Sequence, residues 1–417
     1  MTDAASTADA AGAHRASWPV IVAARRSPIT TKGRGLAGVT ADELAAPIIR
    51  SCVDDAHRAT GLQLEIADVL LGNCMGPGGN VARSASLAAG LDVVVPGMTL
   101  DRQCGSGLSA IISAAESIRA GDNRMIIAGG TESASTAPLR IQDGRVYARA
   151  PFAPTGFPDP EMGPAAEALA RIVGIDRAAQ DAYAERSHRL AVAATQGGVF
   201  GQEIVAVGGI QADDGPRAGI SALLGRFVPL YPSAEEGLAS GGGSRSSVTA
   251  GNSCRISDGA AAVALVPAHA RGTAPGLALR AHATVGCDPA LPGIGPVGAV
   301  DRLLADAGLT IADITAFEIV EAFAAQTLVV LLALGLAELT TGEPDDLRAT
   351  TLRVDDRVCS DGGALALGHP WGASGAVGAV RLFSRLVRAG APAGTLGIST
   401  AAIGGGMGVA ALFEVVR

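Results

Sequence analysis

The chain has 417 residues, of which 48% are hydrophobic but only 3% aromatic, and it carries a formal net charge of −8. This negative charge argues against nucleic acid or an anionic membrane as a partner. The length favours two or three domains or a duplicated one, and the 56 glycines together with the many small aliphatic residues are typical of an α/β protein.

The cysteines and the N-terminus indicate a cytoplasmic protein. The six cysteines are scattered without a CxxC pair, so neither a metal site nor a disulfide framework is expected. Residues 1–17 lack the apolar core of a signal peptide and are predicted to be a disordered extension. The longest apolar helical run, at 323–336, is too short to span a bilayer and contains Gln326, which favours a helix of the core.

In the first half of the chain, buried strands alternate with helical patterns. Strands are predicted at 19–24, 69–72 and 124–130, and helices at 40–57, 82–89 and 108–120. The Gly-rich loop at 73–80 lacks the Gly-Lys-Ser/Thr ending of a phosphate-binding loop, and no dinucleotide fingerprint is present. Nucleotide binding is therefore disfavoured.

Cys104 lies in Asp-Arg-Gln-Cys-Gly-Ser-Gly-Leu (101–108), at a turn that opens a helix. Backbone N–H groups and the dipole at such a helix start favour a thiolate. Gly105 and Gly107 let the backbone and a substrate come close. The stretch therefore suggests a nucleophile, although a buried structural cysteine beside turn glycines fits the same pattern.

The middle of the chain has a different composition. Residues 151–164 are rich in proline, 177–198 predict an amphipathic helix, and 239–247 form a Ser/Gly tract. Because long stretches here lack a strand pattern, we expect 138–250 to lie over the core and shape a substrate entrance. Strands are then predicted at 257–266, 277–285, 314–320 and 396–402, and helices at 297–306, 322–336 and 375–389.

One succession of motifs occurs twice. A Gly/Ser turn, a helix, an Ala-Gly pair and a strand that ends in glycines occupy 105–130, and a similar order occupies 373–406. The spacing from Ser106 to Ala120 is 14 residues, and that from Ser374 to Ala389 is 15. The repeat predicts a duplicated α/β unit with two related sheets, in which Cys104 faces the loop at 368–370.

That second loop carries His369 between Gly368 and Pro370. A histidine there can take the proton of a thiol and form a pair that attacks thioesters. A histidine that merely satisfies a turn is the alternative, but the pairing with Cys104 through the repeat favours the catalytic interpretation. The backbone N–H groups of Cys104 and of a glycine within 404–406 would then bind the oxyanion.

From residue 18 onward, the ordered motifs resemble those of the thiolase family. They are Gln-Cys-Gly-Ser-Gly (103–107), Ala-Gly-Gly-Thr-Glu-Ser (128–133), Thr-Ala-Gly-Asn (249–252), Glu-Ala-Phe (321–323), Gly-His-Pro (368–370) and Gly-Gly-Gly-Met-Gly (404–408). The resemblance implies a five-layered αβαβα fold with duplicated halves at 18–137, completed by about 251–273, and at 274–417. The loop region at 138–250 is inserted between them.

The resemblance also implies the chemistry and its residues. It implies coenzyme A thioesters as substrates with no tightly bound cofactor, ping-pong acyl transfer through an acyl-cysteine, and a homodimer or homotetramer. Cys104 matches the acylated nucleophile, His369 its base, and Gly404 the second oxyanion donor. Arg217 and Ala250 match contacts to coenzyme A, and Cys254 stands near the coenzyme where many members have serine.

Several departures from the family pattern bear on the reaction. Ala402 replaces the second cysteine that moves the α-proton in Claisen chemistry, and Val320 replaces the Asn or His that holds a catalytic water. Near the coenzyme, Glu161 and Arg255 replace His and Gly. Cys359, Ser399 and Thr400 are candidate substitutes for the missing cysteine, although structural roles fit them as well.

Three functions are compatible with this pattern. The first is a thiolase-type acyl-CoA acyltransferase whose carbon–carbon step is weakened or altered, since a positioned acid or base contributes roughly a hundred- to ten-thousandfold. The second is an acyltransferase or thioester hydrolase whose acceptor needs no α-proton abstraction. The third is a catalytically silent homologue that serves as a subunit.

Overall fold

The computed structural model describes residues 18–231, 246–340 and 351–417. The predicted extension at 1–17 and most of the Ser/Gly tract lie outside these ranges. Nine strands form one hydrogen-bonded path, in the order β10-β13-β14-β9-β1-β8-β5-β3-β4. None of the described helices is long and apolar enough to cross a membrane.

The first half builds the part of the sheet from β1 to β4. Its strands are β1 (Pro19–Arg26), β3 (Ile66–Gly72), β4 (Met98–Leu100), β5 (Met125–Ser133) and β8 (Ser257–Pro267), and its helices are α2 (Ala41–Thr60), α3 (Val81–Ala88) and α4 (Ser106–Arg119). Every residue of β5 and β8 is buried. Their runs of Ala, Val, Ile and Leu suit strands that are covered on both faces.

The second half repeats the arrangement. Its strands are β9 (Gly276–Gly286), β10 (Ala316–Ile319), β13 (Leu396–Ile403) and β14 (Met407–Val416), and its helices are α8 (Gly295–Ala307), α9 (Ala324–Ala333) and α11 (Trp371–Leu382). The expected two sheets are joined, because β1 pairs with β9 through Val20–Ala278 and Ile21–Leu277. The two related sheets of the duplicated unit therefore form one continuous path.

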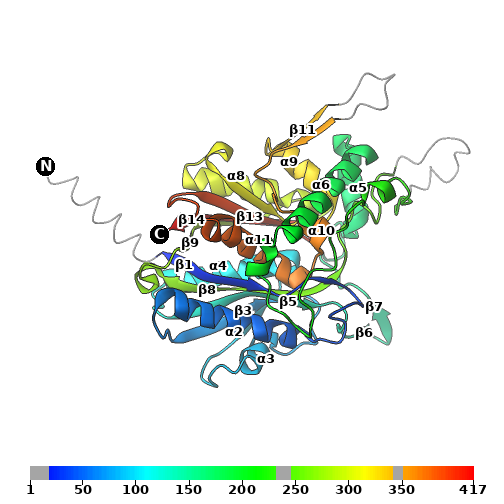
Figure 1. Ribbon diagram of the computed structural model, residues 1–417. Coiled ribbons are helices and arrows are strands. Elements are labelled where there is room, and N and C mark those ends of the chain that lie inside the picture. The colour runs from blue at the N-terminus through cyan, green and yellow to red at the C-terminus, as the bar shows by residue number, and fades with distance from the viewer. Residues whose placement is uncertain (1–17, 232–245, 341–350) are drawn as a thin grey trace, which may run out of the picture.

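The layers follow the predicted αβαβα order (Figure 1). The helices α2 and α3 cover one outer face, α8 and α9 cover the other, and α4 and α11 lie between the two half-sheets. The central helices approach so closely that only glycine fits at two equivalent positions. A Cβ at Gly107 would lie 2.8 Å from the Gly372 carbonyl oxygen, and a Cβ at Gly375 would lie 2.7 Å from the Leu108 nitrogen.

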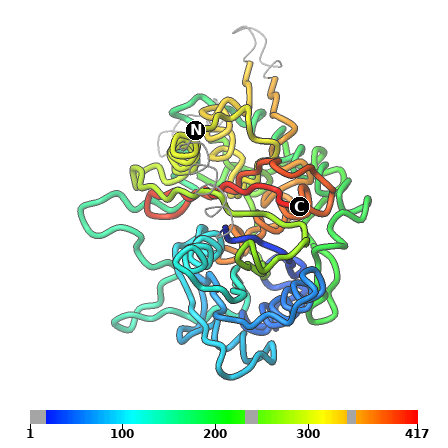
Figure 2. Tube along the Cα trace, turned by 90° about the vertical axis from the view of Figure 1, so that its left-hand side faces the viewer, coloured from blue at the N-terminus to red at the C-terminus, as the bar shows by residue number. Residues whose placement is uncertain are grey.

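The inserted region is more regular than expected. It contains the hairpin β6 (Arg140–Gln142) and β7 (Arg145–Tyr147) and the helices α5 (Met162–Val173), α6 (Arg177–Gln196) and α7 (Ser221–Leu224). Only α6 was predicted. Figure 2 shows the teal and green loops of this region running outside the central layers. The region also covers the core, since a Cβ at Gly404 would lie 2.6 Å from the Phe152 ring.

Glu203 ties the inserted region to the core through a buried charge network. Its carboxylate accepts hydrogen bonds from Arg26 Nε at 2.7 Å, from the Ser384 hydroxyl at 2.8 Å and from Arg381. All these charged side chains are almost fully buried. Arg26 also pairs with Asp213, and Arg381 also pairs with Asp361. Removing Glu203 would still leave an excess of buried positive charge in a medium of low dielectric constant.

Glu203→Ala should therefore lower the free energy of unfolding by about 3–5 kcal/mol, because Arg26 and Arg381 would lose a buried partner. Urea denaturation measures this change. The matched control is Glu65→Ala, which removes an exposed carboxylate 3.4 Å from Arg124 and should cost about 0–1 kcal/mol. Equal losses in the two variants would contradict the structural role of Glu203.

Candidate active site

Cys104 lies in a tight turn that hydrogen bonds hold in place. The 3-10 turn Gln103–Gly105 follows β4 and leads directly into α4. Gln103 has a φ of 47°, a left-handed conformation that costs a non-glycine residue about 1–3 kcal/mol. Asp101 Oδ1 holds this conformation by accepting bonds from the Gln103 backbone N–H at 2.8 Å and from its side-chain amide at 3.0 Å. The cysteine is thus fixed in place by its neighbours.

His369 faces Cys104 from the other half of the chain, as the repeat predicts. Its Nε2 lies 3.3 Å from Cys104 Sγ. Its backbone N–H donates to the Arg255 carbonyl at 2.9 Å. This places the histidine within hydrogen-bond reach of the candidate nucleophile.

Ser374 orients the imidazole. Its hydroxyl lies 2.6 Å from His369 Nδ1 and 3.0 Å from the Pro370 carbonyl oxygen. Because the carbonyl only accepts, the hydroxyl donates its proton there and accepts from Nδ1–H. Nε2 is then left unprotonated toward the thiol. We infer from this pattern that His369 holds the tautomer of a general base.

Burial keeps both partners neutral. It raises the pKa of the Cys104 thiol to about 12, with Glu132 and Asp101 acting in the same direction. Burial also lowers the pKa of His369 to about 4. Both shifts favour a neutral thiol and a neutral imidazole in the resting site, and they oppose the thiolate that the helix start favours. The proton has to move to Nε2 as the sulfur attacks.

This protonation state predicts how Cys104 reacts with iodoacetamide. In His369→Ala, which lacks the base, alkylation needs the free thiolate, so its rate should rise about tenfold per pH unit from pH 6 to pH 10 without a plateau. Peptide mass spectrometry of the Cys104 peptide measures the rate. A plateau near pH 7 in this variant would contradict the raised pKa of the thiol.

Beside the thiol lies a small cavity, which we call the reaction cavity. Its walls are mainly apolar and come from both halves and from α5: Cys104, Met162, Ala165, Ala166, Gly293, Ala322, Phe323, Gln326 and Ala402. Ala402 contributes only a methyl group to this wall. None of the three candidate substitutes for the missing cysteine lines the cavity.

The structure gives each of those substitutes another position. Cys359 is fully buried, and its thiol faces the Ile319 carbonyl at 3.6 Å. The Thr400 hydroxyl donates to the Val409 carbonyl at 2.8 Å. Ser399 faces α11, since a Cβ at Gly378 would lie 2.4 Å from its hydroxyl. These contacts favour the structural interpretation of all three residues.

The Gly404 turn lies next to the cysteine turn. Gly404 follows β13 directly, and the preceding Ile403 packs against Gly105, where a Cβ would lie 2.6 Å from the Ile403 Cδ1 atom. Two turns with backbone N–H groups therefore meet near the thiol. This placement is compatible with the predicted oxyanion donors, Cys104 and Gly404, whose role stays a prediction.

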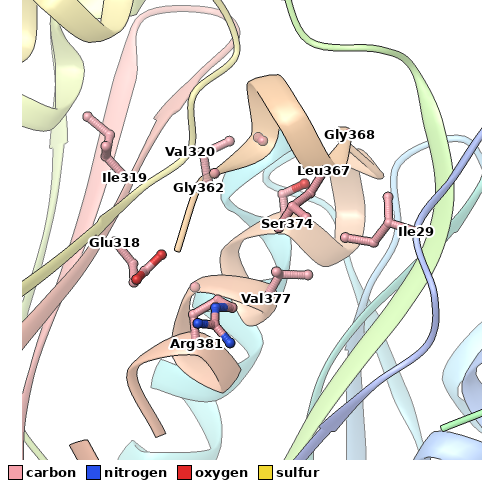
Figure 3. A pocket seen from close by; sticks show the side chains of 13 residues that line it. Ile29, Glu318, Ile319, Val320, Gly362, Leu367, Gly368, Ser374, Val377 and Arg381 are labelled. Carbon is pink, nitrogen blue, oxygen red and sulfur yellow. The ribbon is translucent and has the colours of Figure 1, made fainter. Parts of the chain in front are cut away.

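A second cavity, which we call the rear cavity, lies beside Gly368, the residue that precedes His369 (Figure 3). Val320 lines it together with Gly368 and Ser374, and Glu318 and Arg381 form its far side. Val320 does not line the reaction cavity. Val320, which replaces the usual Asn or His, therefore lies close to Ser374, the residue that orients His369.

The predicted coenzyme contacts surround a groove between the inserted region and the core. The groove is lined by His188, Arg217, Ile220, Phe227, Ala250, Gly251, Ser253, Arg255 and Leu365. Arg217 and Ala250 thus come together as expected. Cys254 does not line the groove, although both of its neighbours do.

Two further residues that differ from the family pattern, Arg255 and Glu161, lie at or near the groove. Arg255 donates to the Gly215 and Ala366 carbonyls and so ties two loops together. Burial and nearby Arg217 lower the pKa of Arg255. Glu161 is mostly exposed and pairs with Arg149 at 3.1 Å, one residue before Met162 of the reaction cavity. Charge at both positions therefore differs from the family pattern.

The fold and site define a class of protein. The thiolase N-terminal domain model matches residues 19–269, and the thiolase C-terminal domain model matches residues 274–415. The chain belongs to the thiolase family.

Individual relatives agree with this class. An acetyl-CoA acetyltransferase of Pseudomonas aeruginosa is 39% identical over 418 residues, covering 94% of this chain and 98% of the relative. The crystal structure of the Bacillus anthracis acetyl-CoA acetyltransferase superposes with a TM-score of 0.80 at 33% identity. That match covers 96% of this chain and 99% of the other chain.

Two residues of the site were not predicted from the sequence. Ser374 was used only to measure the repeat, although its hydroxyl contacts His369. Gln326 was noted only as a polar residue in an apolar run, yet it lines the reaction cavity. The position of Gln326 within an apolar helix could have indicated a site, because a buried amide needs a hydrogen-bond partner.

Proposed function

We propose that the chain is a thiolase-type acyltransferase that takes an acyl group from coenzyme A onto Cys104. The observation that carries the proposal is the 3.3 Å approach of His369 Nε2 to Cys104 Sγ. The likeness to enzymes named acetyl-CoA acetyltransferases supports a short acyl group. The groove with Arg217 and Ala250 is the candidate entrance for the coenzyme.

The residues suggest how the first half-reaction proceeds. Cys104 Sγ attacks the thioester carbon while its proton passes to His369 Nε2. The backbone N–H groups of Cys104 and Gly404 would bind the oxyanion. When the tetrahedral intermediate collapses, the carbon–sulfur bond to coenzyme A breaks and the leaving thiolate takes the proton from His369. Acyl-Cys104 and free coenzyme A remain.

The second half-reaction is altered in this proposal. Claisen condensation requires a base for the α-carbon of the acceptor, and Ala402 offers none. Neither Cys359, Ser399 nor Thr400 lines the reaction cavity. We therefore propose that carbon–carbon bond formation and cleavage are weak compared with acylation of Cys104.

Intact-mass spectrometry after incubation with acetyl-CoA tests the acylation. One added acetyl group is expected, and Cys104→Ala should abolish it. Cys254→Ala is the matched control and should keep the label. Labelling that persists in Cys104→Ala would refute the assigned nucleophile. If no acyl-CoA labels the protein, the chain is a silent homologue.

We also propose that the protein acts as a homodimer or homotetramer in the cytoplasm without a tightly bound cofactor. Exposed apolar side chains support self-association, among them Val93, Val94, Leu139 and Ile141, which are 62–80% exposed. All six cysteines are free, as suits a reducing compartment. Light scattering coupled to size exclusion measures the oligomeric state.

A further inference from the structure

Gln326 differs in chemistry from the rest of the reaction cavity. Apart from Cys104, it is the one polar side chain among the described residues that line the cavity. Gln326 is 2% exposed, and its Nε2 has no hydrogen-bond partner among the described residues. A buried amide donor without a partner costs about 1–3 kcal/mol, so this position indicates a missing acceptor.

Neighbouring residues fix the amide in place. A Cβ at Gly293 would lie 2.6 Å from Gln326 Cγ, so the stem of the side chain packs directly on the backbone of that glycine. On the other end, Gln326 Oε1 lies 3.5 Å from the Thr327 hydroxyl, which donates to the Phe323 carbonyl at 2.9 Å. Turning the amide over would place an oxygen toward the cavity instead of an NH₂ group. A partner that can both donate and accept suits either orientation.

The size of the cavity limits that partner. The cavity measures about 10 Å³, and one water molecule needs roughly 10–15 Å³ of such space. A hydroxyl group or a water molecule therefore fits without movement of Met162 or Phe323. The methyl group of Ala402 adds no competing donor or acceptor.

These observations, taken with the proposed function, identify an acceptor for the acyl group. We infer that Gln326 positions a water molecule beside acyl-Cys104, so that the enzyme hydrolyses short acyl-CoA thioesters. Water attacks with a lone pair on its oxygen, so it needs no abstraction of an α-proton. The site offers no base for such an abstraction, because Ala402 stands where the family has a cysteine. The inference rests on the proposed acylation of Cys104.

The hydrolytic step balances with the groups present. His369 Nε2 takes a proton from water as the water oxygen attacks the acyl carbon. The tetrahedral intermediate then collapses, its carbon–sulfur bond to Cys104 breaks, and His369 returns the proton to Sγ. The products are a carboxylic acid and the free thiol. His369 is neutral after the first half-reaction and can serve again as base.

Gln326→Met tests the inference, since methionine keeps the length of the side chain and removes the amide. With acetyl-CoA in heavy-oxygen water, the wild type should release labelled acetate in step with coenzyme A. In Gln326→Met, deacylation of Cys104 should slow by on the order of a hundredfold, because the water loses its position. The acylation rate, measured by quenched intact mass, is the reference, and deacylation should slow far more than acylation does.

The matched control is Gln196→Met, which makes the same exchange at an exposed position of α6 outside the cavity wall and should leave deacylation unchanged. Retained acylation shows that each variant is folded. If the acylated wild type releases no labelled acetate, or if the deacylation rate is unchanged in Gln326→Met, the role of Gln326 and water is overturned. Absence of acylation in the wild type would instead refute the proposed function.

Discussion

Replacing Ala402 by cysteine should raise thiolysis of acetoacetyl-CoA by roughly a hundred- to ten-thousandfold, the usual contribution of a positioned acid or base. Ala402 lies on β13 and lines the reaction cavity with Cys104. A thiol at this position would face the place where an α-carbon meets the acyl-cysteine. Release of acetyl-CoA, followed by chromatography, measures the gain.

Ala401→Cys is the matched control for this variant. Neighbouring residues of a strand point to opposite faces, so a thiol at 401 would enter the hydrophobic core rather than the cavity. The Ala401→Cys variant should therefore show no gain in thiolysis of acetoacetyl-CoA. Equal gains in both variants would show that the effect does not depend on a thiol in the cavity. No gain in Ala402→Cys would show that the missing cysteine is not what limits carbon–carbon chemistry.

Replacing His369 by alanine should slow acylation of Cys104 by roughly a hundred- to ten-thousandfold near pH 7. The thiol has a pKa of about 12, so it depends on a base to lose its proton during attack. The pKa of His369 is about 4, which means that the wild type should keep its base from pH 5 upward and lose it as the pH falls through 4. Quench-flow mass spectrometry measures the acylation rate.

The pH profile separates a base from a structural residue in this experiment. In His369→Ala, acylation should increase about tenfold per pH unit, because only the small thiolate fraction reacts. The wild-type rate should be nearly constant from pH 6 to pH 9. Ser374→Ala should lower the rate less, since the imidazole remains but loses the bond that orients it. A flat profile in His369→Ala would contradict the assignment of His369 as base.

Much of the fold follows from local patterns in the sequence. Apolar runs predicted β1, β5, β8 and β13, and apolar residues at helical spacing predicted α2 and α6. The glycine repeat predicted that Cys104 and His369 meet, because it marks equivalent turns in the two halves. The close contact of α4 and α11 at Gly107 and Gly375 gives the physical reason for that repeat.

Other features depend on tertiary packing and could not be predicted. β14 was missed, although its ten residues are an almost unbroken apolar run like that of β8, because such a run fits a buried strand and a buried helix equally well. The joining of the half-sheets rests on two residue pairs between β1 and β9. The protonation state of Cys104 depends on how deeply the thiol is buried, and the spacing of residues carries no information on that depth.

We expect acyl transfer to Cys104 to be much faster than carbon–carbon bond formation. Exchange of labelled coenzyme A into acetyl-CoA, set against acetoacetyl-CoA formation in the same mixture, measures both halves at once. We predict exchange that requires Cys104 and His369 and is at least about a hundredfold faster than condensation. Condensation as fast as exchange, or no exchange at all, would contradict the claim.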